Sequence, residues 1–157
     1  MAVYEGQPLP AGSVSLVAPP AELAAAAQDS PDLTEHQKQW CSRARADDQC
    51  LYFVVQYLGQ PIGQIMLHDI DRRKREALVG YHVFEPGDRE RGYGTAALSA
   101  LSQYALGELG LRRLVVITSR DNAASCRIAA KAGFREVGPA REGPDLVCYE
   151  RLAGEAL

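Results

Sequence analysis

The chain has 157 residues, of which 46% are apolar and 24% are charged. That length is typical of one domain that buries roughly two thirds of its unfolded surface, and the composition excludes an intrinsically disordered protein. The net charge is only −3, and basic and acidic residues occur together, as in residues 71–76, so we expect no broad cationic surface for nucleic acid. No leader-like segment and no run long enough to cross a bilayer is present, so we expect no membrane partner.

The cysteines give a second indication of the protein's environment. They stand at positions 41, 50, 126 and 148, without any C-x-x-C pair, inside apolar or helical stretches. This pattern favours buried free thiols over a zinc site. We therefore expect a cytoplasmic protein that binds no metal.

The first third of the chain mixes extended and helical patterns. Residues 1–12 contain proline and glycine and predict an extended lead-in to a single domain that covers residues 1–157. Residues 13–17 predict a short strand. A proline pair then precedes an alanine-rich segment, which predicts a helix over 22–28, and a second helix is expected over about 33–46.

The middle of the chain predicts an antiparallel meander. Two apolar runs of strand length, 50–58 and 62–69, are separated by Gly59 and Gln60 and therefore predict a hairpin. A polar turn at 72–75 leads to a third strand over 77–84.

The second half changes period. Leu98, Leu101 and Ala105 recur at helical spacing, and the apolar run 114–118 then predicts a buried strand reached by a parallel crossover. Asp121 and Asn122 are good capping residues and should begin a second helix, which Gly133 ends, and two strands, 134–137 and 146–152, should close the domain. The predicted class is α+β: a mixed, mostly antiparallel sheet with one parallel βαβ crossover and flanking helices.

A glycine-rich loop, residues 89–94, joins the third strand to the first of these helices. Gly92 and Gly94 permit backbone conformations and close approaches that a Cβ would block. Unpaired amides and the positive end of the helix dipole favour an anion there, and a pyrophosphate offers several acceptor oxygens. Arg89 and Arg91 could add charge-assisted hydrogen bonds, whereas Glu90 opposes the anion and is expected to point outward.

Three other interpretations compete with an anion site at this loop. No G-x-x-x-x-G-K-[ST] run exists, which excludes a Walker-type nucleotide loop. Residues 92–97 fit G-x-G-x-x-A, but seven residues separate them from Phe84, and repeated βαβ units do not follow, which disfavours a dinucleotide fold. A purely structural turn with a helix cap remains open.

The order of the motifs resembles the GNAT superfamily of acyl-CoA-dependent N-acyltransferases. Arg89-x-x-Gly92-x-Gly94 is similar to that family's [QR]-x-x-G-x-[GA] pyrophosphate motif, and Asn122-x-x-Ser125 followed by Lys131-x-Gly133-Phe134 looks like the segment after its fifth strand. Gly80-Tyr81 and Ile62-Gly63 resemble the branch of ribosomal-protein alanine acetyltransferases of the RimJ and RimL type. The resemblance covers residues 50–152.

This resemblance implies a site for acetyl-CoA, used as a co-substrate. Strand backbone would meet the pantetheine arm and the thioester, the loop would hold the pyrophosphate, and the second helix would form the opposite wall, so the strands that carry these residues must splay apart. The expected binding residues are His82, Val83, Phe84, Arg89, Glu90, Arg91, Gly92, Tyr93, Gly94, Thr95, Asn122 and Ser125.

Direct transfer to an amine requires a base more than a strong acid, because the departing thiol has a pKa of only about 8.5. Glu85 is the first candidate for the base because it follows the strand that should carry the thioester, and His82 could substitute. By the resemblance, Ser125 would hydrogen-bond the thiolate, although it could instead cap its helix. Many members of this family place a tyrosine that protonates the leaving thiolate where this chain has Ala129. Tyr149 is therefore a reserve candidate for the acid.

The acceptor is less defined by the sequence. Residues 33–47 and 69–76 should border it, and Trp40 either lines it or belongs to the core. A protein N-terminal amine, a polyamine or aminoglycoside-like amine, and an amino acid all remain candidates. The alternatives to catalysis are a non-catalytic acyl-CoA-binding module and a dinucleotide-dependent oxidoreductase. A homodimer is also open.

Overall fold

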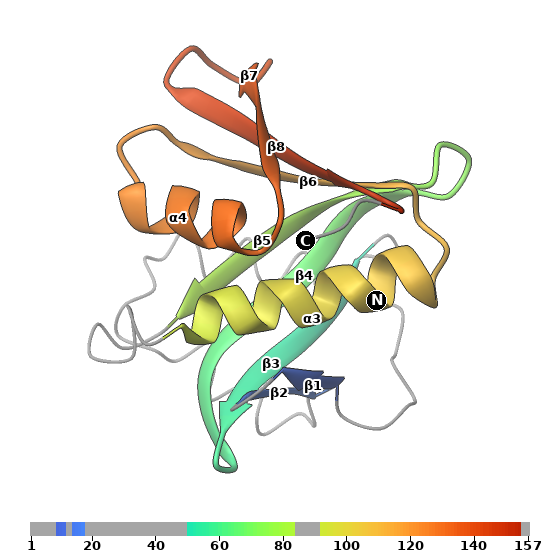
Figure 1. Ribbon diagram of the computed structural model, residues 1–157, viewed down its shortest axis with the longest axis vertical. Helices are drawn as coiled ribbons and strands as arrows, with labels where there is room; N and C mark the ends of the chain where they lie inside the picture. The colour runs from blue at the N-terminus through green and yellow to red at the C-terminus, as the bar shows by residue number, and fades with distance from the viewer. Residues whose placement is uncertain (1–8, 12–13, 18–49, 84–91, 155–157) are drawn as a thin grey trace.

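The computed structural model describes residues 9–11, 14–17, 50–83 and 92–154 (Figure 1). The helices expected at 22–28 and 33–46, together with Trp40 and Cys41, lie outside these ranges. In chain order, the elements are β1 (Leu9–Ala11), β2 (Val14–Val17), β3 (Leu51–Tyr57), β4 (Gln60–Asp71), β5 (Glu76–Val83), α3 (Tyr93–Gly107), β6 (Arg113–Ser119), α4 (Ala123–Lys131), β7 (Arg135–Pro139) and β8 (Leu146–Leu152).

All eight described strands form one sheet in the order β1-β2-β3-β4-β5-β6-β8-β7. Strands β1 to β5 form an antiparallel meander, β5 and β6 pair in parallel, and β8 lies antiparallel between β6 and β7. The predicted mixed sheet with one parallel crossover is confirmed. Because β5–β6 is the one parallel pairing among the described strands, the repeated βαβ units of a dinucleotide fold are absent from this part of the chain.

Local chemistry explains both turns of the meander. Leu58 and Gly59 have φ angles of 50° and 80°, as a two-residue type I′ hairpin requires, and Tyr57 pairs with Gln60 across it. At the polar turn, the backbone N–H groups of Arg73 and Lys74 each donate to Oδ1 of Asp71 at 3.0 Å. The hairpin and the turn at 72–75 are both confirmed.

Helix α3 supplies the main apolar cover of the sheet. Leu98, Leu101 and Ala105 are fully buried, as their spacing predicted, and they belong to the same core cluster as Phe53 and Leu114. The opposite face of the central strands is also buried: Tyr52, Val54 and Met66 are at most 2% exposed. A polar pair lies on that face, where Tyr52 Oη donates to Oε1 of Gln64 at 2.5 Å. The middle of the sheet is therefore buried on both sides.

Helix α4 ends at a glycine, as predicted. Gly133 has a φ of 89°, and its N–H donates to the carbonyl of Ala130, while the N–H of Phe134 donates to the carbonyl of Ala129. This pair of bonds is the Schellman arrangement, which needs a left-handed residue after the helix. The end of α4 at Gly133 leads the chain into β7, which pairs with β8.

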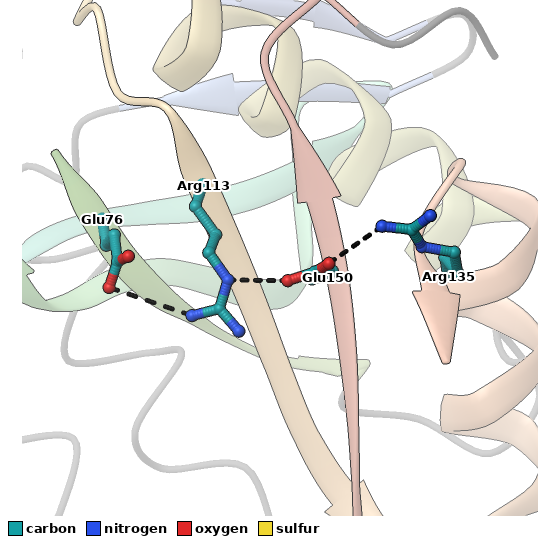
Figure 2. Close-up of polar contacts among 4 residues, drawn as sticks. All are labelled: Glu76, Arg113, Arg135 and Glu150. Atoms are coloured by element: carbon teal, nitrogen blue, oxygen red, sulfur yellow. Dashed lines mark hydrogen bonds and ion pairs between the residues drawn. The ribbon is translucent and has the colours of Figure 1, made fainter. Parts of the chain in front are cut away.

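Four charged side chains lie across the strands where the parallel pairing of β5 and β6 begins (Figure 2). Glu150 on β8 accepts from Arg113 Nε at 2.7 Å and from Arg135 Nη2 at 3.0 Å, and Arg113 Nη1 lies 3.8 Å from Oε2 of Glu76. We call these four residues the charged row. It links β5, β6, β8 and β7.

Two further observations bear on the predicted environment. Cys50 is buried and Cys126 and Cys148 are half-buried, all as free thiols. Across the described ranges, His, Cys, Asp and Glu side chains do not gather in groups of three or more that could hold a metal ion. Neither α3 nor α4 is long and apolar enough to cross a membrane.

Candidate active site

The parallel strands β5 and β6 separate after a short contact. They pair at three positions, ending at Leu78 and Val115, whereas β5 continues to Val83 and β6 to Ser119. In Figure 1 the two strands diverge, β5 toward the start of α3 and β6 toward the start of α4. We call the region between these separated ends the β5–β6 fork. The splaying implied by the family resemblance is confirmed.

The start of α3 has the features of an anion site. Gly92 is the N-cap, with φ 83° and ψ 4°, and its carbonyl accepts from the N–H of Ala96 at 3.0 Å. The first N–H groups of a helix have no acceptor within the helix, and a glycine cap has no side chain to supply one. The first turn of α3 contains no acidic residue. Nothing described at this helix start therefore competes with a bound anion.

The two glycines of the loop have different structural roles. At Gly92 an added Cβ would meet nothing within 4 Å, so the positive φ is what requires glycine. Gly94 is buried, and an added Cβ would lie 2.8 Å from Cδ1 of Ile128 on α4. The described close approach at Gly94 is thus between two helices.

This packing gives a testable prediction. Gly94→Ala should lower the free energy of unfolding by about 1 kcal/mol, because the methyl group overpacks the contact with the end of the Ile128 side chain. Ile128→Val removes that terminal carbon. Adding Gly94→Ala to the Ile128→Val variant should therefore cost much less stability than adding it to the natural chain. Urea unfolding of the four proteins measures the coupling, and simple additivity would contradict the assigned contact.

On the other side of the fork, four side chains from three elements come together. Tyr81 on β5 places its hydroxyl 3.0 Å from the carbonyl oxygen and 2.9 Å from Oγ of Ser125 on α4. Cys126 follows Ser125 and lies near enough to Tyr149 on β8 to contribute to the raised pKa of that phenol. We call Tyr81, Ser125, Cys126 and Tyr149 the hydroxyl cluster. It connects both sides of the fork.

Both phenols of the cluster hold their protons tightly. Burial raises the pKa of Tyr81 to about 12, against a smaller opposing effect of its hydrogen bond to Ser125. Burial also raises the pKa of Tyr149, and Cys126 and Glu136 add to the shift. A phenol with a raised pKa donates hydrogen bonds but gives up its proton poorly, so these groups suit hydrogen bonding better than acid catalysis.

Asn122 has a defined local role. It is the N-cap of α4, and its Oδ1 accepts from the backbone N–H of Ser125 at 3.0 Å. The capping role considered for Ser125 therefore belongs to Asn122, which leaves the Ser125 hydroxyl for Tyr81. The cap fixes the backbone of Ser125 beside the fork.

The remaining predicted site residues divide between described and undescribed positions. Phe84, Glu85, Arg89, Glu90 and Arg91 lie outside the described residues and stay predictions. His82 and Val83 are part of β5, where they pair with Gln64 and Gly63 of β4. Tyr93 and Thr95 occupy the first turn of α3, where the ring of Tyr93 packs on Tyr57 at a centroid distance of 4.9 Å.

One expectation about the acceptor was wrong. The segment 69–76 was expected to border the amine, but it forms the turn at the start of β5, where the N–H groups of Arg112 and Arg113 donate to the carbonyl of Arg75. The fork lies at the other end of the eight-residue strand β5, roughly 20 Å away at the rise of a β-strand. The turn cannot line a site at the fork.

Sequence reasoning also missed the contact of Tyr81 with Ser125. In the sequence, Tyr81 stands out only as part of a Gly-Tyr pair that resembles the family, and 44 positions separate it from Ser125. The strand period could have placed Tyr81 on the same face as Val79, which packs into the core, and so toward the helices. Nothing in the sequence gave the distance between β5 and α4.

Comparison with known proteins agrees with this geometry. The family model described as "Acetyltransferase (GNAT) domain" matches residues 15–135. YdaF of Bacillus subtilis (strain 168), provisionally named a ribosomal N-acetyltransferase, is 35% identical over 106 residues. That alignment covers 63% of this chain and 57% of YdaF, so the chain spans little more than half of this relative.

Solved structures extend the likeness over almost the whole chain. Mycobacterium smegmatis RimJ in complex with a CoA disulfide superposes with a TM-score of 0.75 and 25% identity, over 94% of this chain and 86% of RimJ. The microcin C7 self-immunity acetyltransferase MccE, in complex with acetyl-CoA and AMP, gives a TM-score of 0.70 at 18% identity, over 90% of this chain and 93% of MccE. At 18% identity, the similarity to MccE shows a shared fold alone.

Proposed function

Because the chain belongs to the GNAT acetyltransferase domain family, we propose that it is an N-acetyltransferase that transfers an acetyl group from acetyl-CoA to a primary amine. The acceptor is a protein N-terminus or a small-molecule amine. The observation that carries the proposal is the β5–β6 fork. On one side of it lies the start of α3, whose glycine cap and first turn without acidic residues suit an anion, and on the other side lies the hydroxyl cluster.

The helix start supports the binding of the donor. The pyrophosphate of acetyl-CoA carries negative charge and several acceptor oxygens, which suit the first N–H groups and the positive dipole end of α3. In the proposal, Arg89 and Arg91 add charge and Phe84 supplies backbone to the pantetheine arm. The thioester then lies between the separated strands.

The reaction is a direct attack in a ternary complex. The amine nitrogen attacks the thioester carbonyl carbon, the C–S bond breaks, and the sulfur leaves with the electron pair as a thiolate. Glu85 takes the proton that the amine loses, directly or through water, with His82 as the alternative. Ser125 donates a hydrogen bond to the thiolate, and Tyr149 is the reserve donor.

A non-catalytic acyl-CoA-binding module is the second interpretation, and the small residue at position 129 motivated it. Ala129 is fully buried in α4 and belongs to the core cluster with α3. Close packing accounts for a small side chain there. The position therefore gives no support of its own to a loss of catalysis.

An amine panel tests the proposal. Purified protein is mixed with acetyl-CoA and, separately, with N-terminal peptides of ribosomal proteins, polyamines, aminoglycosides and amino acids. Thiol release should match the amount of acetylated amine found by mass spectrometry for at least one class. Saturable binding of acetyl-CoA without turnover on any amine would instead favour the module.

The cellular setting follows from the same proposal. A cytoplasmic enzyme would meet both acetyl-CoA and newly made protein N-termini, and the free thiols fit a reducing compartment.

We also propose that the protein forms a homodimer and binds no nucleic acid. Analytical ultracentrifugation of the pure protein, with and without RNA, tests both.

A further inference from the structure

A single phenol reaches two oxygens of one serine at the fork. Tyr81 Oη lies 3.0 Å from the Ser125 carbonyl oxygen and 2.9 Å from Ser125 Oγ. The phenol has one proton, so it can donate fully to only one of them. When it donates to the carbonyl, the Ser125 hydroxyl must donate back to Tyr81 Oη; when it donates to Oγ, the serine proton is free to point elsewhere.

The second arrangement leaves the Ser125 carbonyl with a hydrogen-bond donor. Ser125 lies in the first turn of α4, and helical geometry brings the N–H of Ala129 to the Ser125 carbonyl. The carbonyl therefore keeps a donor when Tyr81 turns to Oγ. Exchange between the two arrangements requires only rotation of two hydroxyl groups.

A developing negative charge selects between these arrangements. A hydrogen bond to an ionised acceptor is about twice as strong as one between neutral groups. A thiolate formed beside Ser125 would therefore attract the serine proton, while Tyr81 supplies the replacement donor to Oγ. Donation to Oγ also polarises the serine hydroxyl and strengthens its own donated bond.

The serine is otherwise held in place. Its backbone N–H donates to Oδ1 of Asn122, the helix cap, at 3.0 Å, and the Tyr81 contacts hold its carbonyl and hydroxyl. Burial keeps Tyr81 protonated throughout the physiological range, since its pKa is about 12. The same value makes Tyr81 too weak an acid to protonate a thiolate itself, because a thiol has a pKa of about 8.5.

We propose that Tyr81 is a positioning residue that directs the hydroxyl proton of Ser125 toward the sulfur of the departing CoA. This rests on the proposed acetyl transfer and adds a residue that acts through Ser125. Tyr81 forms no bond to the reacting atoms. It orients and polarises the group that does.

The kinetic test is a double-mutant cycle with Tyr81→Phe, which keeps the ring and removes the hydroxyl. Single-turnover acetyl transfer to an amine accepted in the panel should slow about tenfold in Tyr81→Phe and more in Ser125→Ala, while the affinity for acetyl-CoA stays unchanged. The double variant should be no slower than Ser125→Ala, because Tyr81 acts through that hydroxyl. Losses that multiply in the double variant would overturn the proposal.

A second measurement separates this proposal from the proposed reaction. Ultraviolet titration of CoA bound to the protein gives the pKa of its thiol without any turnover. That pKa should rise by about one unit in both Tyr81→Phe and Ser125→Ala relative to the natural chain, since each weakens the hydrogen bond to the thiolate. A rise in Ser125→Ala alone would overturn the role of Tyr81, even if no amine is acetylated. A failure to bind CoA would overturn both proposals.

Two further variants guard the interpretation. Ser102→Ala removes a buried serine hydroxyl that donates within α3, to the Leu98 carbonyl at 2.6 Å, far from Ser125 in the chain. It should change stability but neither the transfer rate nor the thiol pKa. If Tyr81→Phe does not fold, as judged by its melting transition, Tyr81→Met tests the same loss of the hydroxyl.

Discussion

Replacing Gly92 by alanine is expected to raise the KM for acetyl-CoA by about tenfold or more. Gly92 has a φ of 83°, a region that disfavours any side chain, so alanine should pull the helix start out of its present geometry. The first N–H groups of α3 would then no longer point together at the pyrophosphate, and hydrogen bonds to a charged group contribute about 1.5–3 kcal/mol each. Acetyl-pantetheine lacks the pyrophosphate, so its KM should hardly change.

Gly110 offers a matched control for this experiment. It also has a positive φ, 72°, with nothing within 4 Å of an added Cβ, but it follows the other end of α3. Gly110→Ala should therefore lose similar stability, about 1 kcal/mol, and keep its KM for both donors. The pyrophosphate assignment would be contradicted if Gly92→Ala weakened the two donors equally, or if Gly110→Ala had the same effect on acetyl-CoA.

The elements with a strong local signal were those that the sequence predicted well. The 3.6-residue period of Leu98, Leu101 and Ala105 and the left-handed Gly133 are properties of neighbouring residues, and the structure confirms them. Strand β1 was missed within the lead-in expected over residues 1–12. It has three residues, one of them Pro10, and it forms because β2 offers an edge to pair with, which is a tertiary cause.

The sequence named residues on both sides of the candidate site, but it did not predict the contact between Tyr81 and Ser125. The start of α3, which is suited to binding an anion, depends on Gly92 and on the order of strand, loop and helix, both of which are visible in the sequence. The contact of Tyr81 with Ser125 depends on how far β5 and β6 have separated when α4 begins. That distance is set by the three-residue pairing of the strands and by the packing of Gly94 on Ile128, neither of which has a local sequence signal.

The charged row stabilises the closed end of the same fork. Glu150 has a side chain only 14% exposed, and it accepts from two arginines that are themselves 32% and 62% exposed. Its hydrogen bond with Arg113 is the main cause that lowers the Glu150 pKa, against an opposing effect of burial, and Arg135 adds to the lowering. Arg113 in turn lies beside Glu76, so the row ties β5 to β6 where their parallel pairing begins. The strands can separate farther along because this end is held.

Glu150→Gln should therefore lower the free energy of unfolding by about 1–2 kcal/mol at pH 7, after allowance for the solvent exposure of Arg135. Because the folded state lowers the pKa of Glu150, its charged form stabilises the protein above the unfolded value of about 4.3 and loses that effect as the pH falls through the lower folded value. Urea unfolding at neutral and at acidic pH should show the difference between the two proteins shrinking with acidification. The exposed Glu142→Gln is the matched control and should show little difference at either pH. A loss in Glu150→Gln that stayed constant with pH would mean that packing, not the charge of Glu150, holds the closed end of the fork.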